Sequence, residues 1–544
     1  MNLLAQAGDL AGVLNWLDLT IVIGAMVLLL GIGLWTGRRE HDTRDFFLGG
    51  RNVPMVIAAL SLVATEVSAV SITNNPGTGA TEDLRYLQFF IGSAASKVFV
   101  AFLFLPVFYR HDCTSIYEFL RHRFGPPSQI AGSAFFLVTR VLASGVRLLA
   151  ACGAISLITG WGLMPTLALF TVASIAFIGF GGVKAVVWTG AYQAVVFVGA
   201  GLAVLGYFAC QIPGGLDEIV RVAGDAGRLK LLDFGSSLAT PTNFWAGTAN
   251  AFFIGLVMFG ADQEMVQRLL TVRTRRTSQR AILSSIAAAL PVTVTYLLIG
   301  TVLFVLLTRV EPAALLLSAK EIFPHAVREL LPAGLKGLVL AAILLASIDS
   351  PLASLSSSFV VDLYRPLIAP RASQRHLLWV SRAGVAGAAV LLVGVALLCQ
   401  GADNLLWLAF QIVSITGGSL LGVFLVGLLT RRGSNRANLV AMIANTLLMA
   451  AVLAMTQKGP AGLKVLVGLT DGPAPKGEAP ILALGWTWVV VIGTLLTMAL
   501  SYALSFLWPP PPKSTPGGTV DATGTRAAAG TAADSPAPQP ASVV

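Results

Sequence analysis

The sequence predicts an all-α protein that crosses a membrane many times. Of its 544 residues, 56% are hydrophobic and only 11% are charged, which is more apolar surface than the interior of a soluble protein of this size holds. Apolar runs close to twenty residues long, the length of a membrane-spanning helix, recur along most of the chain. These runs do not alternate with a period of two residues, so a closed β-barrel is excluded.

We expect thirteen membrane-spanning helices, with boundaries uncertain by a few residues. The first apolar run follows a start that lacks the basic residues of a signal peptide, so we interpret it as an uncleaved anchor helix. The expected helices lie at about 17–36, 53–76, 86–108, 129–159, 163–181, 186–211, 243–265, 281–308, 332–364, 378–399, 404–430, 437–456 and 481–508.

The basic residues predict the orientation, because cations resist translocation across a membrane. One set of alternate loops carries 19 Lys and Arg, whereas the opposite set, together with the N-terminus, carries 10. We therefore expect the N-terminus outside and the C-terminus in the cytoplasm of a plasma membrane, of the bacterial inner-membrane type. The net charge of +10 is assigned to this topology rather than to nucleic-acid binding. The Pro/Ala/Gly/Ser/Thr-rich tail at 509–544 predicts disorder.

The sequence carries no set of residues typical of an enzyme. The five histidines form no HExxH pair, no GxxxxGK phosphate loop is present, and the four cysteines are scattered without metal-site spacing. The expected partners are the lipid bilayer and a small-molecule solute.

The second expected helix is polar where apolar residues are the rule. Thr65, Glu66, Ser68 and Ser71 lie in it, and it ends at Pro76. Because polar groups inside membrane spans usually line a cavity or a route, this helix is interpreted as a cavity wall. The alternative is a buried, protonated Glu66 that hydrogen-bonds to a neighbouring helix.

The ninth expected helix contains the candidate for a cation site. Ser347, Asp349 and Ser350 precede Pro351, which has no N–H and therefore frees the Ser347 carbonyl from its helical partner. Carbonyl and hydroxyl oxygens with one carboxylate suit a hard cation such as sodium. The alternative is that these small polar residues only pack helices together.

Two arginines on the fourth expected helix add positive charge at membrane depth. Arg140 and Arg147 are seven residues apart and therefore lie on one helix face. They are expected to pair with Glu66, with Asp349 or with an anionic substrate.

Six motifs together resemble one family, the sodium/solute symporters. Each motif alone is weak, but their order and their expected sides of the membrane agree over nearly the whole chain. They are DFFLGGRNVP at 45–54, TSIYEFLRHRFG at 114–125, GGVKAVVWTGAYQ at 181–193, ADQEMVQRLL at 261–270, LASIDSPLASLSSSFVVDLYRP at 345–366 and GSLLGVFLVGLL at 418–429.

The resemblance implies a ten-helix core built from two inverted five-helix repeats, helices two to six and seven to eleven. The first helix of each repeat is expected to be broken, and helix seven carries Gly255, Gly260 and Asp262. The implied division is an N-terminus, anchor helix and first loop at 1–52, a transport core at 53–431, two accessory helices at 432–508 and the tail at 509–544.

The resemblance also implies a sodium site between the broken second helix and the serine-rich ninth helix. Its carbonyls correspond to Ala64, Val67 and Ile343, and its hydroxyls to positions 346 and 347. Ser347 is present but position 346 is alanine, so one hydroxyl is missing. Gly190 likewise stands where the family commonly has an aspartate. We hypothesise that Asp349, beside Ser350, supplies the missing negative charge.

The implied substrate contacts lie on the broken helix and on helices seven and eleven. They are Glu66, Ser68, Ser71, Met258 and Gln411. Met258 occupies the position of a gate tyrosine in sugar carriers, which argues against a close copy of a sugar carrier.

The implied function is sodium-coupled symport of a small organic or anionic solute by alternating access, with sodium as the coupling ion and no other cofactor. Two alternatives stay open, a proton-coupled symporter of the same fold and a non-transporting membrane sensor.

Overall fold

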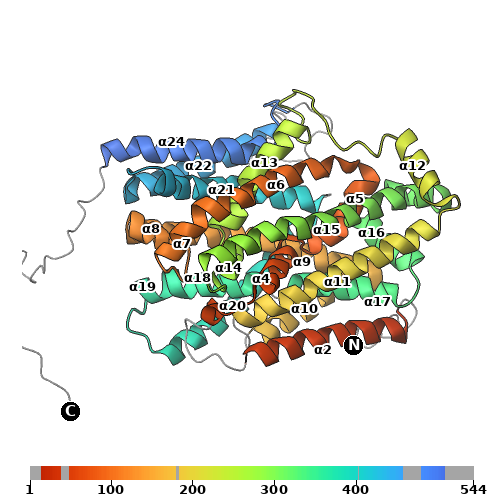
Figure 1. The fold of residues 1–544 in the computed structure, drawn as a ribbon, viewed down its shortest axis with the longest axis horizontal. Coiled ribbons are helices and arrows are strands. Elements are labelled where there is room, and N and C mark those ends of the chain that lie inside the picture. Colours follow the sequence, from red (N-terminus) through yellow and green to blue (C-terminus); the bar gives the residue numbers. More distant parts are fainter. Residues whose placement is uncertain are drawn as a thin grey trace, which may run out of the picture.

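The computed structural model describes residues 14–37, 48–178, 183–348, 350–401, 404–457 and 480–508. At residues 37, 176–178, 347, 348, 350 and 457 only the backbone is described. The described part is helical and contains no strand, and its long helices lie roughly side by side along the longest axis of the molecule (Figure 1).

Eleven helices in the described ranges are long and apolar enough to span a membrane, and a bent pair, α4 and α5, counts as a twelfth. The expected helix at 163–181 coincides with α10 (Leu163–Ile178), a shorter apolar helix. The all-α membrane fold is thus confirmed, whereas the number thirteen stays a prediction. The eleven are α2 (Trp16–Gly37), α6 (Leu87–Phe99) continued by η3 (Val100–Phe104) and α7 (Leu105–Arg110), α9 (Pro126–Thr159), α11 (Val183–Cys210), α13 (Phe244–Leu256) continued by η4 (Val257–Ala261), α15 (Arg275–Val310), α17 (Leu335–Ile348) with α18 (Ser350–Ser358), α20 (Gln374–Leu398), α21 (Leu405–Leu429), α22 (Asn435–Gln457) and α24 (Trp488–Leu507).

The outward faces of these helices carry large apolar side chains. Ile23, Val172 and Leu391 are among the exposed ones. Apolar surface of this kind suits lipid, because hydrocarbon solvates it without the penalty that water imposes.

The second expected helix is broken at the polar stretch. It consists of α4 (Met55–Glu66) and α5 (Ala69–Thr81), which are bent by 57° relative to each other. At the break the Ser68 N–H donates to the Glu66 carbonyl at 3.2 Å, and the Ser71 N–H donates to the Ser68 carbonyl at 2.9 Å. In a continuous helix these donors would serve the carbonyls of Ala64 and Val67. The break therefore releases both of those oxygens from the helical ladder.

A second break follows α13. The chain passes through the π-helix η4 and reaches Asp262 in an extended conformation, with φ −102° and ψ 121°, before α14 (Gln263–Leu270) begins. The Asp262 carboxylate caps α14 by accepting a hydrogen bond from the Glu264 N–H at 2.8 Å. An extended residue that directs its carboxylate at free N–H groups is a normal helix start.

Close backbone approach fixes α5 against two neighbours, α15 and α16 (Ala319–Leu330). A Cβ added to Gly77 would lie 1.7 Å from the Ala319 carbonyl oxygen, and one added to Gly300 would lie 2.1 Å from the Pro76 oxygen. Only glycine allows helices to approach so closely.

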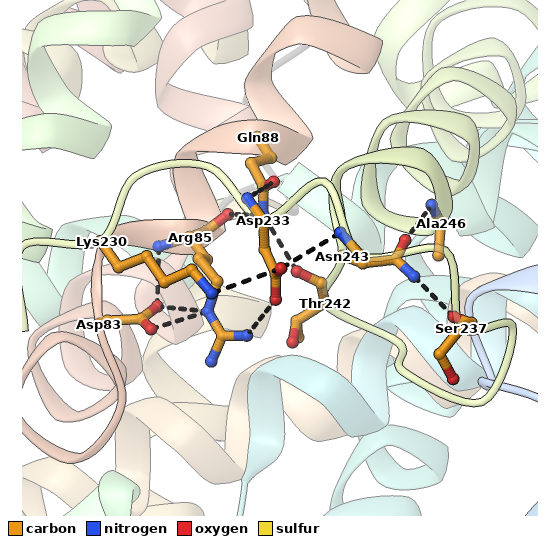
Figure 2. A network of polar contacts seen from close by, with 10 residues as sticks. Asp83, Arg85, Gln88, Lys230, Asp233, Ser237, Thr242, Asn243 and Ala246 are labelled. Atoms are coloured by element: carbon orange, nitrogen blue, oxygen red, sulfur yellow. Dashed lines mark hydrogen bonds and ion pairs between the residues drawn. The ribbon is translucent and has the colours of Figure 1, made fainter. Parts of the chain in front are cut away.

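A polar network ties the linker between α12 (Gly215–Asp225) and α13 to the start of α6 (Figure 2). The Asp233 carboxylate accepts from Arg85 at 3.0 Å and lies 3.3 Å from the Lys230 ammonium. The Asp233 N–H donates to Gln88 Oε1 at 2.9 Å, and Asn243 caps α13. The linker therefore fastens the start of α13 to the η2 (Leu84–Tyr86) and α6 segment that follows α5.

Candidate functional site

A cavity of about 140 Å³ lies between the two broken helices. Its wall is mostly apolar and aromatic, with Tyr86, Phe89 and Phe90 from η2 (Leu84–Tyr86) and α6 and Phe410 from α21. Trp407 packs on this wall, with ring centroids 5.6 Å from Phe89 and 6.0 Å from Phe410. A few polar groups in an apolar hollow are typical of a small-molecule site.

Four of the five predicted substrate residues line this cavity. They are Glu66, Ser68, Ser71 and Met258. Gln411 does not line the cavity, although its neighbour Phe410 does. The break at Val67 and Ser68 brings the first three together, because it turns the end of α4 and the start of α5 toward one space.

Glu66 forms an ion pair with Lys97 of α6. The Lys97 Nζ lies 2.6 Å from Glu66 Oε2 and 4.8 Å from the centre of the Phe259 ring. The Lys97 side chain is completely buried, whereas 20% of the Glu66 side chain is exposed. The Ser93 hydroxyl adds a longer hydrogen bond of 3.4 Å to Glu66 Oε1. The pairing of Glu66 with the arginines of α9, one of the options left open by the sequence, does not occur.

Arg140 instead pairs with the acids at the second break. Its guanidinium lies 3.2 Å from Asp262 and also contacts the buried carboxylate of Glu264. Arg268, four residues after Glu264, donates to the Glu264 carbonyl at 3.2 Å and to the Ser61 hydroxyl at 3.1 Å. This cluster joins α4, α9 and α14 at one side of the larger cavity.

A smaller cavity of about 30 Å³ lies on the other side of the α4–α5 break. Ala64 and Thr65 line it from α4, and Ala346 and Pro351 line it from α17 and α18. This volume is about the share of one water molecule in the liquid, and the released carbonyl of Ala64 is an oxygen of the kind that sodium prefers. The smaller cavity therefore has room for a water molecule or a small ion beside Ala64.

The other predicted sodium ligands fall into two groups. Ile343 is completely buried on α17, and Val67 lines the larger cavity rather than the smaller one. The side chains of Ser347 and Ser350, and Asp349 altogether, lie outside the described residues, so the proposed compensation by Asp349 stays a prediction.

Gly190 lies against Ser61, and an added Cβ would stand 2.5 Å from the Ser61 hydroxyl oxygen. The same hydroxyl accepts the hydrogen bond from Arg268. An acidic side chain at position 190 would therefore have to displace Ser61. The neighbouring Arg268 also donates to the Glu264 carbonyl.

Arg147 is the residue that borders both cavities. It is half-buried, and no hydrogen bond or ion pair joins it to another described side chain. A guanidinium at membrane depth with free donors is costly, so it is expected to bind an anion.

The sequence did not identify Lys97 as the partner of Glu66. Lys97 was visible as a lysine inside an apolar run, and a charge in such a place requires a partner. Glu66 on the preceding helix was available, but 31 positions separate the two residues, and no helical spacing connects them. The described residues contain no group of three or more His, Cys, Asp and Glu that would hold a metal ion.

Comparisons with known proteins agree on one family. The model described as the sodium:solute symporter family matches residues 46–445. The human sodium-coupled monocarboxylate transporter 1 is 28% identical over 441 residues, which cover 78% of this chain and 71% of the relative. The human sodium/iodide cotransporter is 29% identical over 419 residues, which cover 74% of this chain and 64% of the relative.

One solved structure shows the same fold. It is a Na⁺-coupled sialic acid symporter in a substrate-bound, outward-open state, with a TM-score of 0.76 and 21% sequence identity. The alignment covers 91% of this chain and 99% of that chain.

Proposed function

The chain belongs to the sodium:solute symporter family, and from this premise we propose that it carries a small monocarboxylate, or a similarly small monoanion, together with sodium. It is a sodium-coupled secondary transporter of a small solute. The solute class is inferred from the charge and the size of the larger cavity. Sodium is the coupling ion.

The observation that carries the proposal is the Arg147 guanidinium in the cavity wall, which makes no hydrogen bond or ion pair with another described side chain. The other charges near the cavity are satisfied within the protein, since Glu66 pairs with Lys97 and Arg140 pairs with Asp262. Among the described residues, one cation thus remains for the solute. Guanidinium binds carboxylate with two parallel hydrogen bonds, which supports a carboxylate substrate.

The size of the cavity supports a small solute. A cavity of about 150 Å³ in another protein holds one benzene molecule, and the volume here is about 140 Å³. Relatives named as monocarboxylate and iodide transporters carry small monoanions, in agreement with this estimate.

We place the sodium ion in the smaller cavity, between the Ala64 carbonyl and α17. Arg147 then explains the coupling, because its charge opposes a cation in the neighbouring cavity until a carboxylate offsets it. Sodium and the anion therefore increase each other's affinity, as linkage requires. We further propose the orientation that the basic residues predict, with the C-terminus in the cytoplasm of a bacterial inner membrane.

The test is uptake of radiolabelled propionate, lactate and pyruvate into proteoliposomes. An inward sodium gradient at fixed pH is expected to drive uptake, whereas a pH gradient without sodium is not. R147Q is expected to lower uptake at least 100-fold, and R147K, which keeps the charge without the two-pronged geometry, less.

Sodium-independent uptake driven by the pH gradient would favour proton coupling instead. Absence of uptake of any monoanion, with sodium-dependent uptake of a neutral or cationic solute, would reject the proposed solute class.

A further inference from the structure

The Glu66–Lys97 pair places a carboxylate in the wall of the cavity that Arg147 also lines. Lys97 is completely buried beneath Phe259, and Glu66 reaches from the last turn of α4 to the cavity surface. Burial of a lysine without a partner is strongly unfavourable, and the Glu66 carboxylate, 2.6 Å from the Lys97 Nζ, is that partner. Glu66 therefore does not require a cationic group on the solute.

The Glu66 carboxylate nevertheless retains acceptor capacity that the protein does not use. A carboxylate accepts about four hydrogen bonds, and its protein partners among the described residues are Lys97 at Oε2 and Ser93 at Oε1. The cavity that it lines is mostly aromatic and apolar, with Tyr86 and Phe90 in the wall, and it also contains hydroxyl and amide side chains such as Ser71 and Asn75. Free acceptors in such a place need donors, from water or from the solute.

Arg147 and Glu66, which both line the cavity, thus impose different requirements on a solute. Arg147 attracts one carboxylate, whereas Glu66 repels a second carboxylate and accepts a hydrogen bond from a neutral donor. A hydroxyl group meets the second requirement. A simple alkyl or oxo group does not, because neither has a proton to donate.

We propose that Glu66, held by Lys97, is a specificity-determining residue that selects hydroxylated monocarboxylates. This inference rests on the proposed function and narrows its solute class. Arg147 binds the carboxylate, and the solute hydroxyl donates to Glu66.

The experiment compares solutes that share a three-carbon skeleton and differ at one substituent. Lactate and 3-hydroxypropionate carry the hydroxyl at two positions, propionate carries none, pyruvate carries an oxo group, alanine an ammonium and malonate a second carboxylate. In proteoliposomes with a sodium gradient, at least one hydroxy acid is expected to have a kcat/KM about ten- to hundredfold above propionate, the range for one hydrogen bond to a charged group. Malonate is expected to be the poorest solute, because Glu66 repels its second carboxylate.

The matched variant is E66M/K97M, which replaces the buried ion pair by two apolar side chains of similar size and is compatible with folding. The ratio of hydroxy-acid to propionate kcat/KM is expected to fall to about one, and this ratio rather than the absolute rate is the readout. K97R, which keeps a cation beneath Glu66, is expected to preserve the preference. A purely structural role for the pair would lower uptake of all solutes together and leave the ratio unchanged.

The outcomes separate the two proposals. Sodium-driven uptake of propionate and hydroxy acids with equal kcat/KM in the wild type overturns the role of Glu66 and leaves the proposed function intact. A preference for alanine also overturns it, because a zwitterion would then be the solute. No uptake of any monocarboxylate overturns the proposed function itself.

Discussion

The two broken helices differ in how their ends are satisfied. At the first break, Ser68 makes no side-chain cap hydrogen bond, and the carbonyls of Ala64 and Val67 are left without helical donors. At the second break, Asp262 caps α14 and pairs with Arg140, and Glu264 is buried beside the same arginine. The first break leaves two carbonyl oxygens without helical donors, whereas at the second break the Asp262 side chain caps the next helix.

This difference suggests that the first break binds the sodium ion, whereas the second break stabilises the fold. Ala64, whose carbonyl is released at the first break, lines the smaller cavity, where we propose that a hard cation binds. The ion pairs at the second break hold α14 against α9. The ion pair of Glu66 with Lys97 and the close approach of α5 to α15 and α16 both fix the first break.

The largest expected effect tests that close approach. In G300A the added methyl group would meet the Pro76 oxygen at 2.1 Å, so α5 and α15 must separate. We expect a loss of stability of about 3 kcal/mol or more, or failure to fold. Thermal unfolding in detergent, followed by size-exclusion chromatography, measures this effect.

The control is G199A, because nothing lies within 4 Å of a Cβ at Gly199. Alanine favours a helix over glycine, so this variant should be at least as stable as the wild type. Equal unfolding temperatures for G300A and the wild type would show that packing does not fix the first break.

The next prediction contrasts the two breaks directly. E264Q removes a completely buried carboxylate from beside Arg140 and is expected to cost about 3 kcal/mol, because the arginine is left with less compensation. S68A removes a side chain that makes no cap bond and is expected to change stability by less than about 0.5 kcal/mol. Similar losses for both, in the same unfolding assay, would mean that the two breaks are supported alike.

The sequence predicted the first break well because its signal was local. Polar residues and Pro76 interrupt an apolar run, and the structure breaks at Val67 and Ser68 within that run. Asp262 was likewise recognised beside two glycines. The family resemblance rested on local motifs too, and the family model confirms it over residues 46–445.

The sequence could not assign partners across helices. Arg140 and Arg147 were treated as an equivalent pair on one face, yet Arg140 is held by Asp262 while Arg147 lies between the two cavities. Lys97 reaches Glu66 across the protein interior, from α6 to the last residue of α4. Helical periodicity gives the direction of a side chain around its own helix but not the identity of the neighbouring helix.

A smaller effect is expected at the alkali-ion site of the first break. A346S would return a hydroxyl to the α17 wall of the smaller cavity. One added oxygen ligand is expected to lower the sodium concentration for half-maximal uptake about three- to tenfold, whereas A389S, on α20 in the wall of the same cavity, serves as the control. An unchanged sodium dependence in A346S would place the ion elsewhere.

The smallest effect concerns the linker between α12 and α13, which contacts the segment that follows α5. A hydrogen bond from the Gly235 N–H, together with Lys230 and Arg85, holds the pKa of Asp233 below its ordinary value. A carboxylate with a lowered pKa stabilises the folded linker above its ordinary pKa of about 3.9, and this contribution is lost as the pH falls through the lowered value. The protection of residues 226–243 against amide hydrogen exchange, relative to the unfolded chain at the same pH, is therefore expected to stay unchanged from pH 7 to pH 5.

Asparagine at this position removes the charge at every pH. D233N is expected to speed exchange in residues 226–243 at pH 7 by a few-fold only, because the pairs are partly solvent-exposed and such pairs contribute little. Exchange at the Glu66–Ser68 break should not change in the same variant. Faster exchange there would mean that the linker supports the first break as well, and the contrast between the two breaks would then have to include it.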